Sequence, residues 1–275
     1  MRGGLQPAWY SAGRLPHAVL PTDDVQEMIR LSAVVITRNE AEMIRGCLES
    51  LAFCDEIIVV DSGSDDDTVA IARSLGATVV ERDWPGFGPQ KEFARSLARG
   101  EWVLSIDADE RIPHELRQEI ELAIANPDPK AYDMPRLSTF LGRPMRHSGW
   151  WPDRILRLFR RDSAVFSSDV VHERVVFNGA VGHLQNPIEH HPIRRLEDAL
   201  RRMETYSSLG AAKLRSEDRR PGPVSGVLHG LFAFVSTYGL KRGFLDGAEG
   251  FANACIHAQT VFWKYTKAWM DRRSR

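Results

Sequence analysis

Three acidic side chains stand directly behind an apolar run in the stretch LSIDADERI, where Asp107, Asp109 and Glu110 follow Ile106. Two carboxylates separated by one residue at a turn can share a hard divalent cation, and that cation can also bind phosphate oxygens. The alternative is a solvated strand end, because a lone Asp-x-Asp pattern is most often a polar turn. The residues that follow the neighbouring apolar runs separate the two interpretations.

Two other apolar runs also lead into polar groups suited to a nucleotide. The run LSAVVIT leads into Thr37, Arg38 and Glu40, and the run EIIVVD ends in Asp61. In an open parallel sheet, ligands bind beyond the carboxyl ends of the strands. An aspartate there can accept hydrogen bonds from a ribose or from uracil. No Walker loop or dinucleotide fingerprint follows the first run, so a metal is the expected means of neutralising a diphosphate.

An alternation of apolar runs and amphipathic segments must position these groups. The expected strands cover 31–37, 56–61, 77–81 and 101–107, and the helices that alternate with them cover 39–53, 65–75, 89–99 and 113–126. Asn39 is predicted to cap the first helix, with Glu42 as its capping-box partner. Such an alternation requires a mostly parallel sheet with right-handed crossovers. The predicted fold class is α/β.

The pattern changes after Pro127. AYDMPRLSTFL and RILRLFRR are predicted as strands, VVHERVVFNG as a strand or hairpin, and the segment from residue 192 to 215 as a long helix. The predicted organisation is a disordered extension at 1–30, a catalytic domain at 31–193 and a helical region at 194–275. Within the catalytic domain, a nucleotide-sugar half (31–126) precedes an acceptor half (127–193).

Composition and charge narrow the function classes. The 275 residues are 43% hydrophobic and 27% charged, which is typical of a soluble globular protein. Residues 194–275 carry 15 Lys and Arg against 8 Asp and Glu, while the whole chain has a net charge of −1. An acidic body with a basic tail argues against nucleic acid as a partner and suits an anionic membrane surface. Three scattered cysteines favour a reducing cytoplasm.

Three separated blocks, VVITRNE, IIVVDSGSDDDT and GEWVLSIDADE, resemble glycosyltransferase family 2, whose members have the GT-A fold, Rossmann-like with helices flanking the sheet. The resemblance implies a nucleotide-sugar donor, a divalent metal (Mg²⁺ or Mn²⁺) and inversion at the anomeric carbon. It implies the following roles: nucleotide pocket for Thr37, Arg38 and Glu40, base contact for Asp61, ribose side for Asp107, donor contact for Lys91, and metal ligand for Asp109. Glu92 departs from the asparagine that the family often has.

The second half is similar to the lipopolysaccharide-core β-glucosyltransferase branch of that family. The similar segments include WWPDRILRLFRR, VHERVVFNG and PIEHHP, and the likeness then extends over most of residues 31–270. It implies transfer of glucose from UDP-glucose to an inner-core heptose, a lipid-linked saccharide, at the cytoplasmic face of the membrane. It also implies His190 as a second metal ligand.

Inverting transfer needs a general base for the acceptor hydroxyl. Glu173 in VHER is the first candidate, because it is an acid on an otherwise apolar segment beyond the nucleotide half. The alternative is that Glu173 forms a surface ion pair with Arg174 or Arg154. Asp153 in WWPDR is the second candidate.

The stretch from residue 223 to 240 contains no fixed charge, but its 18 residues reach only the lower edge of a membrane span. We expect this C-terminal helical appendage to lie on the membrane, with Lys264, Lys267, Arg272, Arg273 and Arg275 touching anionic lipid. The predicted location is therefore cytoplasmic and peripheral on the inner face of the cytoplasmic membrane. Plain packing against the catalytic domain is the alternative.

Three other functions fit part of the pattern. A family 2 enzyme could use another nucleotide sugar to build a capsular, exopolysaccharide or polyprenyl-linked glycan. A nucleotidyltransferase would also use strand-end acids and a metal, but it would normally need a Gly- and Lys-rich segment where TRNEAE stands. A non-catalytic nucleotide-binding module would bind the same ligand without turning it over.

Overall fold

A computed structural model of the chain describes residues 29–126, 128–167, 174–219 and 221–271. Three sets of predicted features lie outside these ranges: nearly all of the expected N-terminal extension, the base candidate Glu173, and the basic residues Arg272, Arg273 and Arg275.

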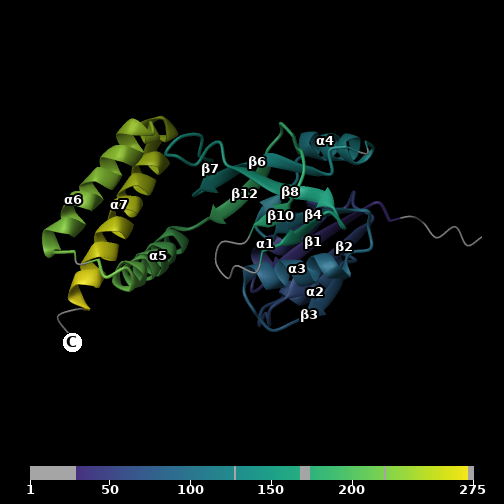
Figure 1. Cartoon of the computed structure of the whole chain (residues 1–275), viewed down its shortest axis with the longest axis horizontal. Coiled ribbons are helices and arrows are strands. Elements are labelled where there is room, and N and C mark those ends of the chain that lie inside the picture. Colours follow the sequence, from purple (N-terminus) through teal and green to yellow (C-terminus); the bar gives the residue numbers. More distant parts are fainter. Residues whose placement is uncertain (1–28, 127, 168–173, 220, 272–275) are drawn as a thin grey trace, which may run out of the picture.

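One twisted sheet forms the body of the molecule (Figure 1). Its first half is parallel in the order β3-β2-β1-β4. These strands are β1 (Leu31–Thr37), β2 (Glu56–Asp61), β3 (Thr78–Glu81) and β4 (Trp102–Asp107). All four lie within a residue of the predicted ranges, and their carboxyl ends meet at one edge of the sheet.

The second half of the sheet is mixed. β8 runs antiparallel to both β4 and β6, while β12 runs parallel to β6 and antiparallel to β5. The strands are β5 (Glu110–Arg111), β6 (Ala131–Phe140), β7 (Arg143–Pro144), β8 (Arg154–Arg160), β11 (Val181–His183) and β12 (Ile188–Ile193), with a separate hairpin of β9 (Ala164–Phe166) and β10 (Val175–Phe177). The predicted α/β class with helices flanking a sheet is confirmed.

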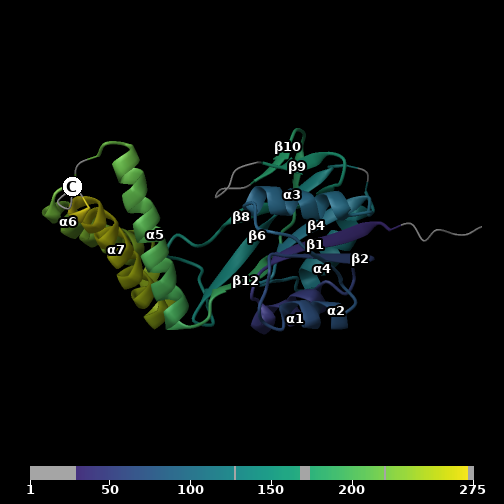
Figure 2. The ribbon, with the colours of Figure 1, turned by 90° about the horizontal axis from the view of Figure 1, so that it is seen from below.

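Helices cover both faces of the sheet (Figure 2). They are α1 (Ala41–Ser50), α2 (Thr68–Ser74) and α4 (His114–Ile124) on one face and α3 (Phe87–Leu97) with the β9–β10 hairpin on the other. Successive strand residues point to opposite faces, so Val35 packs in the α1 core and Val34 in the α3 core. This double burial explains why the strands are continuous apolar runs.

The predicted capping box of α1 is wrong. The helix begins at Ala41, and Glu40 at the N-cap makes no side-chain capping bond. Asn39 has a φ of 56°, and its side-chain oxygen accepts a hydrogen bond from the backbone N–H of Asp65 at 2.9 Å. Asn39 is therefore used to join the turn after β1 to the turn after β2, which a local sequence pattern does not reveal.

Three helices form an appendage beside the sheet (Figure 1). α7 (Gly247–Met270) packs against both α5 (Leu196–Ser216) and α6 (Pro223–Phe234). A π-helical turn (Val235–Leu240) and a 3₁₀ turn (Gly243–Asp246) connect α6 to α7. None of the described helices is long and apolar enough to cross a membrane.

One buried carboxylate anchors the appendage to the body. Asp246 accepts hydrogen bonds from the backbone N–H groups of Arg146 and His147, at 3.1 and 3.2 Å, and from the Ser148 hydroxyl at 3.0 Å. A small apolar cluster next to it joins Phe140 and Ile193 of the sheet to Ile256 of α7. The helices are thus attached near the β7 end of the sheet.

Candidate active site

Asp107 ends β4 and lies between two cations. Its Oδ1 is 2.9 Å from the Nζ of Lys91 on α3, and its Oδ2 is 2.5 Å from a guanidinium nitrogen of Arg157 on β8. Burial alone would raise the pKa of Asp107, but Arg157 and Lys91 outweigh it and hold that pKa well below its usual range. The pairing of Lys91 with Asp107 joins two residues that the resemblance placed beside the donor.

The ion pairs continue through the buried Glu110. This carboxylate accepts a hydrogen bond from Arg157 at 2.8 Å and lies 3.5 Å from Arg136, which in turn donates to Asp153 at 2.7 Å. Its other oxygen accepts the backbone N–H of Asp107 at 2.9 Å. The base candidate Asp153 is therefore the outer end of a charge network that holds the end of β4 in place.

Asp109 lies two residues beyond β4 and faces β12. Its Oδ2 is 3.4 Å from the Nε2 of His190, and the Nδ1 of His190 is 2.7 Å from the hydroxyl of Ser138 on β6. Burial raises the pKa of Asp109, but the hydrogen bond and charge of His190 outweigh it, so this pKa lies below its usual value. The structure thus brings together the two residues that the resemblance implied as metal ligands.

The donor set at Asp109 fits a hard cation that also takes oxygens from its substrate. No group of three His, Cys, Asp or Glu side chains in the described ranges could hold a metal alone. Asp109 and His190 supply one oxygen and one nitrogen, and Mg²⁺ commonly binds through one or two protein ligands, substrate phosphates and water. Lys91 and Arg157 hold both oxygens of the Asp107 carboxylate, so Asp109 is the carboxylate of the Asp-x-Asp pair that faces His190.

Asp61 and Thr37 lie next to each other at the ends of β2 and β1. The Asp61 carboxylate is buried and accepts the backbone N–H groups of Gly63 and Ser64, at 2.9 and 2.8 Å, and the hydroxyl of Ser64. The buried Thr37 hydroxyl has no partner among the described residues. Asp61 therefore shapes the turn after β2, and the Thr37 hydroxyl is left for a ligand or water.

Glu40 and Asp109 line a pocket of about 250 Å³. Burial, and after it the charge of Asp109, raise the pKa of Glu40 to about 7. Arg38, two residues before Glu40 in the chain, is exposed. The pocket is completed by Met43, His191, Pro192, Arg194, Asp198, Arg201 and Arg202.

Sequence reasoning missed two sets of residues here. Arg136 and Arg157 complete the charge network around Glu110. Glu110 stands behind the fourth apolar run and Arg157 lies in WWPDRILRLFRR, but nothing in the sequence predicts that the two arginines reach this carboxylate. The arginines at the start of α5 have no motif at all. The sequence feature that could have indicated them is the excess of basic residues after position 193. That excess predicts contact with anionic lipid and does not distinguish the arginines of a ligand pocket.

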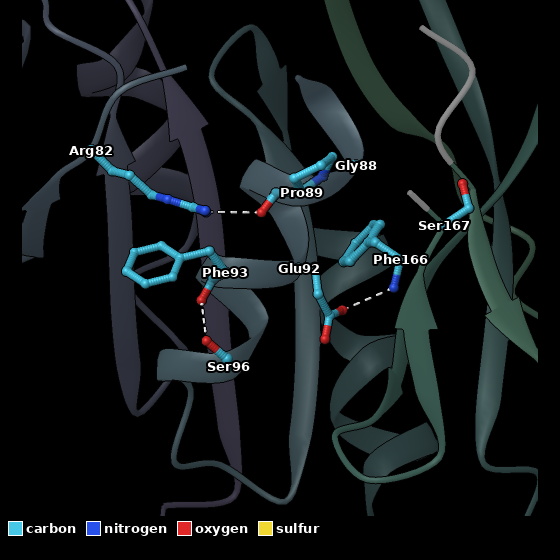
Figure 3. A pocket seen from close by; sticks show the side chains of 8 residues that line it. All are labelled: Arg82, Gly88, Pro89, Glu92, Phe93, Ser96, Phe166 and Ser167. Atoms are coloured by element: carbon cyan, nitrogen blue, oxygen red, sulfur yellow. Dashed lines mark hydrogen bonds between the residues drawn. The ribbon is translucent and has the colours of Figure 1, made fainter. Parts of the chain in front are cut away.

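A second cavity of about 410 Å³ lies outside α3 and contains none of the predicted site residues (Figure 3). The Arg82 guanidinium stacks 4.4 Å from the Phe93 ring and donates to the Pro89 carbonyl at 3.0 Å. Glu92 accepts the backbone N–H of Phe166 at 2.9 Å. Glu92 therefore ties α3 to β9, which gives a structural reason for its departure from the usual asparagine.

Comparisons with known proteins give consistent matches. A profile of glycosyl transferase family 2 matches residues 32–182. A glycosyltransferase of Rickettsia felis is 32% identical over 256 residues, which cover 87% of this chain and 89% of that protein. The lipopolysaccharide core biosynthesis glycosyltransferase LpsC of Rhizobium meliloti is 29% identical over 254 residues, 86% of this chain and 93% of LpsC. The S. aureus TarS 1–349 crystal structure has a TM-score of 0.45 and 15% identity, with 90% and 92% coverage.

Proposed function

This chain belongs to glycosyl transferase family 2 and has the GT-A fold, and from that membership we propose that it transfers a hexose from a nucleotide sugar to a lipid-linked saccharide, with inversion. We propose UDP-glucose as the donor and an inner-core heptose of lipopolysaccharide as the acceptor. The similarity to LpsC supports an acceptor in the lipopolysaccharide core. The observation that carries the proposal is the Asp109–His190 pair, which lies beside the Asp107 carboxylate that Lys91 and Arg157 hold.

The donor would lie along the carboxyl edge of β1, β2 and β4. There the unpaired Thr37 hydroxyl and the turn held by Asp61 would contact the base, and Lys91 and Asp107 would contact the ribose side. A carboxylate can accept more hydrogen bonds than the three that Asp61 receives from its own turn. The ion pairs of Asp107 fix its carboxylate before the donor arrives, so little reorganisation accompanies binding.

Asp109 and His190 would hold a divalent metal, Mg²⁺ or Mn²⁺. When bound, that ion supplies positive charge against the diphosphate as the bond to the anomeric carbon breaks. The Ser138 hydroxyl on the Nδ1 of His190 fixes the orientation of the imidazole, so that Nε2 faces Asp109. Removing the Asp109 or the His190 side chain would leave the other without this contact.

The general base would take the proton of the acceptor hydroxyl as its oxygen bonds to the anomeric carbon and the nucleoside diphosphate leaves. Asp153 is less suited to this role than its position in the sequence suggested, because Arg136 donates two hydrogen bonds to one of its oxygens, at 3.0 and 2.7 Å. We therefore propose Glu173, outside the described residues, as the base. Asp153 is the alternative.

A membrane-bound acceptor agrees with the unusual packing of α6. Towards α7, this helix presents its small residues: Gly226 lies against Phe262, Gly230 against Ala258, and Ala233 is buried. Five of its bulky apolar residues are instead 56–67% exposed: Val224, Val227, Leu228, Leu231 and Phe232. Val235, directly after the helix, is 49% exposed. Small residues between helices and bulky ones outside are the arrangement of helices in lipid.

We propose that this α6 face lies in the interfacial region of the bilayer. Leu240, Phe244 and Leu245 continue it with exposures of 50–73%, and the exposed Lys241 and Arg242 stand next to them, which suits anionic headgroups. Such a face would support a peripheral location on the cytoplasmic membrane, at its inner surface. The reaction would then take place beside the lipid that carries the acceptor.

A donor panel tests the reaction. The purified protein is incubated with nucleotide sugars, Mg²⁺ or Mn²⁺, and a core saccharide acceptor, and release of nucleoside diphosphate is measured. UDP-glucose should give the largest metal-dependent signal. A larger signal from another donor would replace glucose and keep the family 2 reaction, whereas release of pyrophosphate would indicate a nucleotidyltransferase. Binding of UDP without any release would support a non-catalytic module.

Matched variants test the base. Glu173→Gln should lower kcat by about 10²–10⁴-fold, the usual contribution of a general base, with little change in the binding of UDP. Asp153→Asn should have a smaller effect on kcat. The opposite ranking of the two variants would assign the base to Asp153.

A further inference from the structure

The pocket beside Asp109 is lined by residues from the edge of the sheet in the body and by residues from the start of α5 in the appendage. Glu40 and Met43 come from the start of α1, and Arg201 and Arg202 come from the second turn of α5. Its volume of about 250 Å³ is below the 300–1,000 Å³ typical of sites for whole small-molecule ligands. It therefore suits one group of a ligand, such as a phosphate or part of a sugar.

The three arginines of the pocket differ in how they are used. Arg194 pairs with Glu42, and Arg201 lies 3.0 Å from Asp198. Arg202 makes no hydrogen bond or ion pair with another described residue, but its charge acts on both Asp109 and Glu40. A guanidinium can bind an oxyanion through two parallel hydrogen bonds, and within the described ranges no residue accepts from that of Arg202.

The position of Arg202 favours the acceptor over the donor. Apart from Arg38 and Glu40 in the turn before α1, the expected donor contacts come from β1, β2, α3 and β4. Arg202 stands on α5, which follows β12 on the other side of Asp109 and packs against α7, the partner of α6. An acceptor anchored in the lipid that α6 contacts would reach Asp109 along α5.

We propose that this arginine pocket, with Arg202 as its principal cation, binds a phosphate group carried by the acceptor saccharide. The inference rests on the proposed function and names a chemical feature of its acceptor. Three arginines of β8 are engaged elsewhere, since Arg154 pairs with Asp133, Arg157 with Asp107, and Arg160 with Glu101. Selection of a phosphorylated acceptor would therefore depend on α5.

Inorganic phosphate is the probe for this subsite. The full-length protein is first saturated with UDP and Mg²⁺, which fills the donor site, and phosphate is then titrated by calorimetry. Wild type should bind one phosphate, and Arg202→Gln should weaken that binding about tenfold, the usual effect of losing a charged hydrogen bond. The affinity for UDP should change less than twofold. The control Arg45→Gln removes an exposed arginine of α1 that is absent from the pocket, and it should match wild type.

Each contrary outcome has a different meaning. If the UDP-loaded protein binds no phosphate, or if Arg45→Gln weakens the binding as much as Arg202→Gln, the subsite is overturned and the proposed reaction stands. If Arg202→Gln weakens UDP as strongly as phosphate, the arginine serves the donor diphosphate and the acceptor assignment is overturned. If wild type does not bind UDP with Mg²⁺, the proposed function fails and the inference fails with it.

Discussion

The body of this protein and helix α6 of the appendage bury different kinds of side chain. All of the largest fully buried residues belong to the body, among them Trp102, Phe140 and Phe159. In α6 the buried positions are Gly226, Gly230 and Ala233, while Leu231 and Phe232 are 63% and 67% exposed. The body is built as proteins are in water, where removal of apolar area drives folding. The outer face of α6 instead has the bulky apolar side chains that suit an apolar environment.

The two regions also differ in how they use charge. At the edge of the body, acids and bases alternate in a buried network in which Arg157 bridges Asp107 and Glu110. The stretch from residue 223 to 240 has no fixed charge. The network preorganises a site for a charged ligand, whereas the uncharged helix leaves its outer face suited to lipid. Substitutions in one region should therefore change properties that substitutions in the other leave intact.

The largest expected effect is on catalysis. Asp109→Asn should lower metal-dependent transfer by about 10²–10³-fold, because it removes the carboxylate that would hold the metal against the leaving diphosphate. Thermal stability should stay close to wild type, since Asp109 is not an internal support of the sheet. Nucleoside diphosphate release measures the first property and calorimetry the second. The control Asp162→Asn changes an 84% exposed aspartate, and a similar loss there would contradict the assignment.

The next effect is on the stability of the body. Arg157→Met removes a buried cation and leaves Asp107 and Glu110 without their shared partner. The free energy of unfolding should fall by about 3–5 kcal/mol, as for other broken buried ion pairs, when measured by urea titration. Arg99→Met, at a 71% exposed arginine, should change it by less than about 0.5 kcal/mol. Equal stability of both variants would mean that the network is not a support.

The appendage should respond in the opposite way. Leu231→Ser together with Phe232→Ser should lower binding to anionic vesicles by at least about tenfold, because each bulky apolar side chain contributes about 1.5–3 kcal/mol when it leaves water. The free energy of unfolding should change little, since both side chains are exposed without lipid. Vesicle sedimentation and urea titration measure the two properties.

A matched control for the α6 face lies in the body. Leu122 on α4 is 69% exposed, so Leu122→Ser removes an equally exposed leucine on a different surface and should leave vesicle binding unchanged. If the α6 variant instead changes the oligomeric state and not the vesicle binding, the face is an interface between two copies of the chain.

The smallest effect concerns Glu40. Its pKa of about 7 in the folded protein lies above its ordinary value of 4.5, so the folded state binds its proton more tightly than the unfolded state does. The stability linked to that proton is fully present below pH 4.5 and is lost as the pH rises through 7. In metal-free buffer, Glu40→Gln should therefore be more stable than wild type at pH 8 and equal to it at pH 4.5. The difference at pH 8 should be about 1 kcal/mol, which is less than the full linkage energy because Glu40 is partly exposed to solvent.

Urea titrations at the two pH values check this prediction. Glu49→Gln, at a 57% exposed glutamate of the same helix, is the matched control for the loss of a carboxylate from α1. A constant difference between Glu40→Gln and wild type at both pH values would show that the carboxyl group does not titrate in this range.

The nucleotide half was the part most accessible to prediction. Its strands are buried on both faces, so each is a continuous apolar run such as LSAVVIT, and the polar residues that follow them mark one edge of the sheet. The Asp109–His190 contact was expected only through the family resemblance, because 81 residues separate the two positions in the chain. Local pattern carries no information on a pair that only the tertiary fold creates.

The remaining features depended on such long-range pairs. Arg136 and Arg157 belong to strands of the second half, and nothing in their neighbours indicates that both reach Glu110. The apolar character of residues 223–240 was plain, but which side of α6 would face α7 followed only from the close approach of Gly226 and Gly230 to that helix. The arginines of α5 acquired a possible ligand only when the fold placed them beside Asp109.

Titration of Mn²⁺ followed by electron paramagnetic resonance tests the central claim most directly, because the signal of the free ion reports binding without need of the acceptor. Wild type should bind one Mn²⁺ far more tightly with UDP present than without it, and Asp109→Asn should lose most of that UDP-dependent binding. Equal Mn²⁺ affinity of wild type and Asp109→Asn in the presence of UDP would contradict the account.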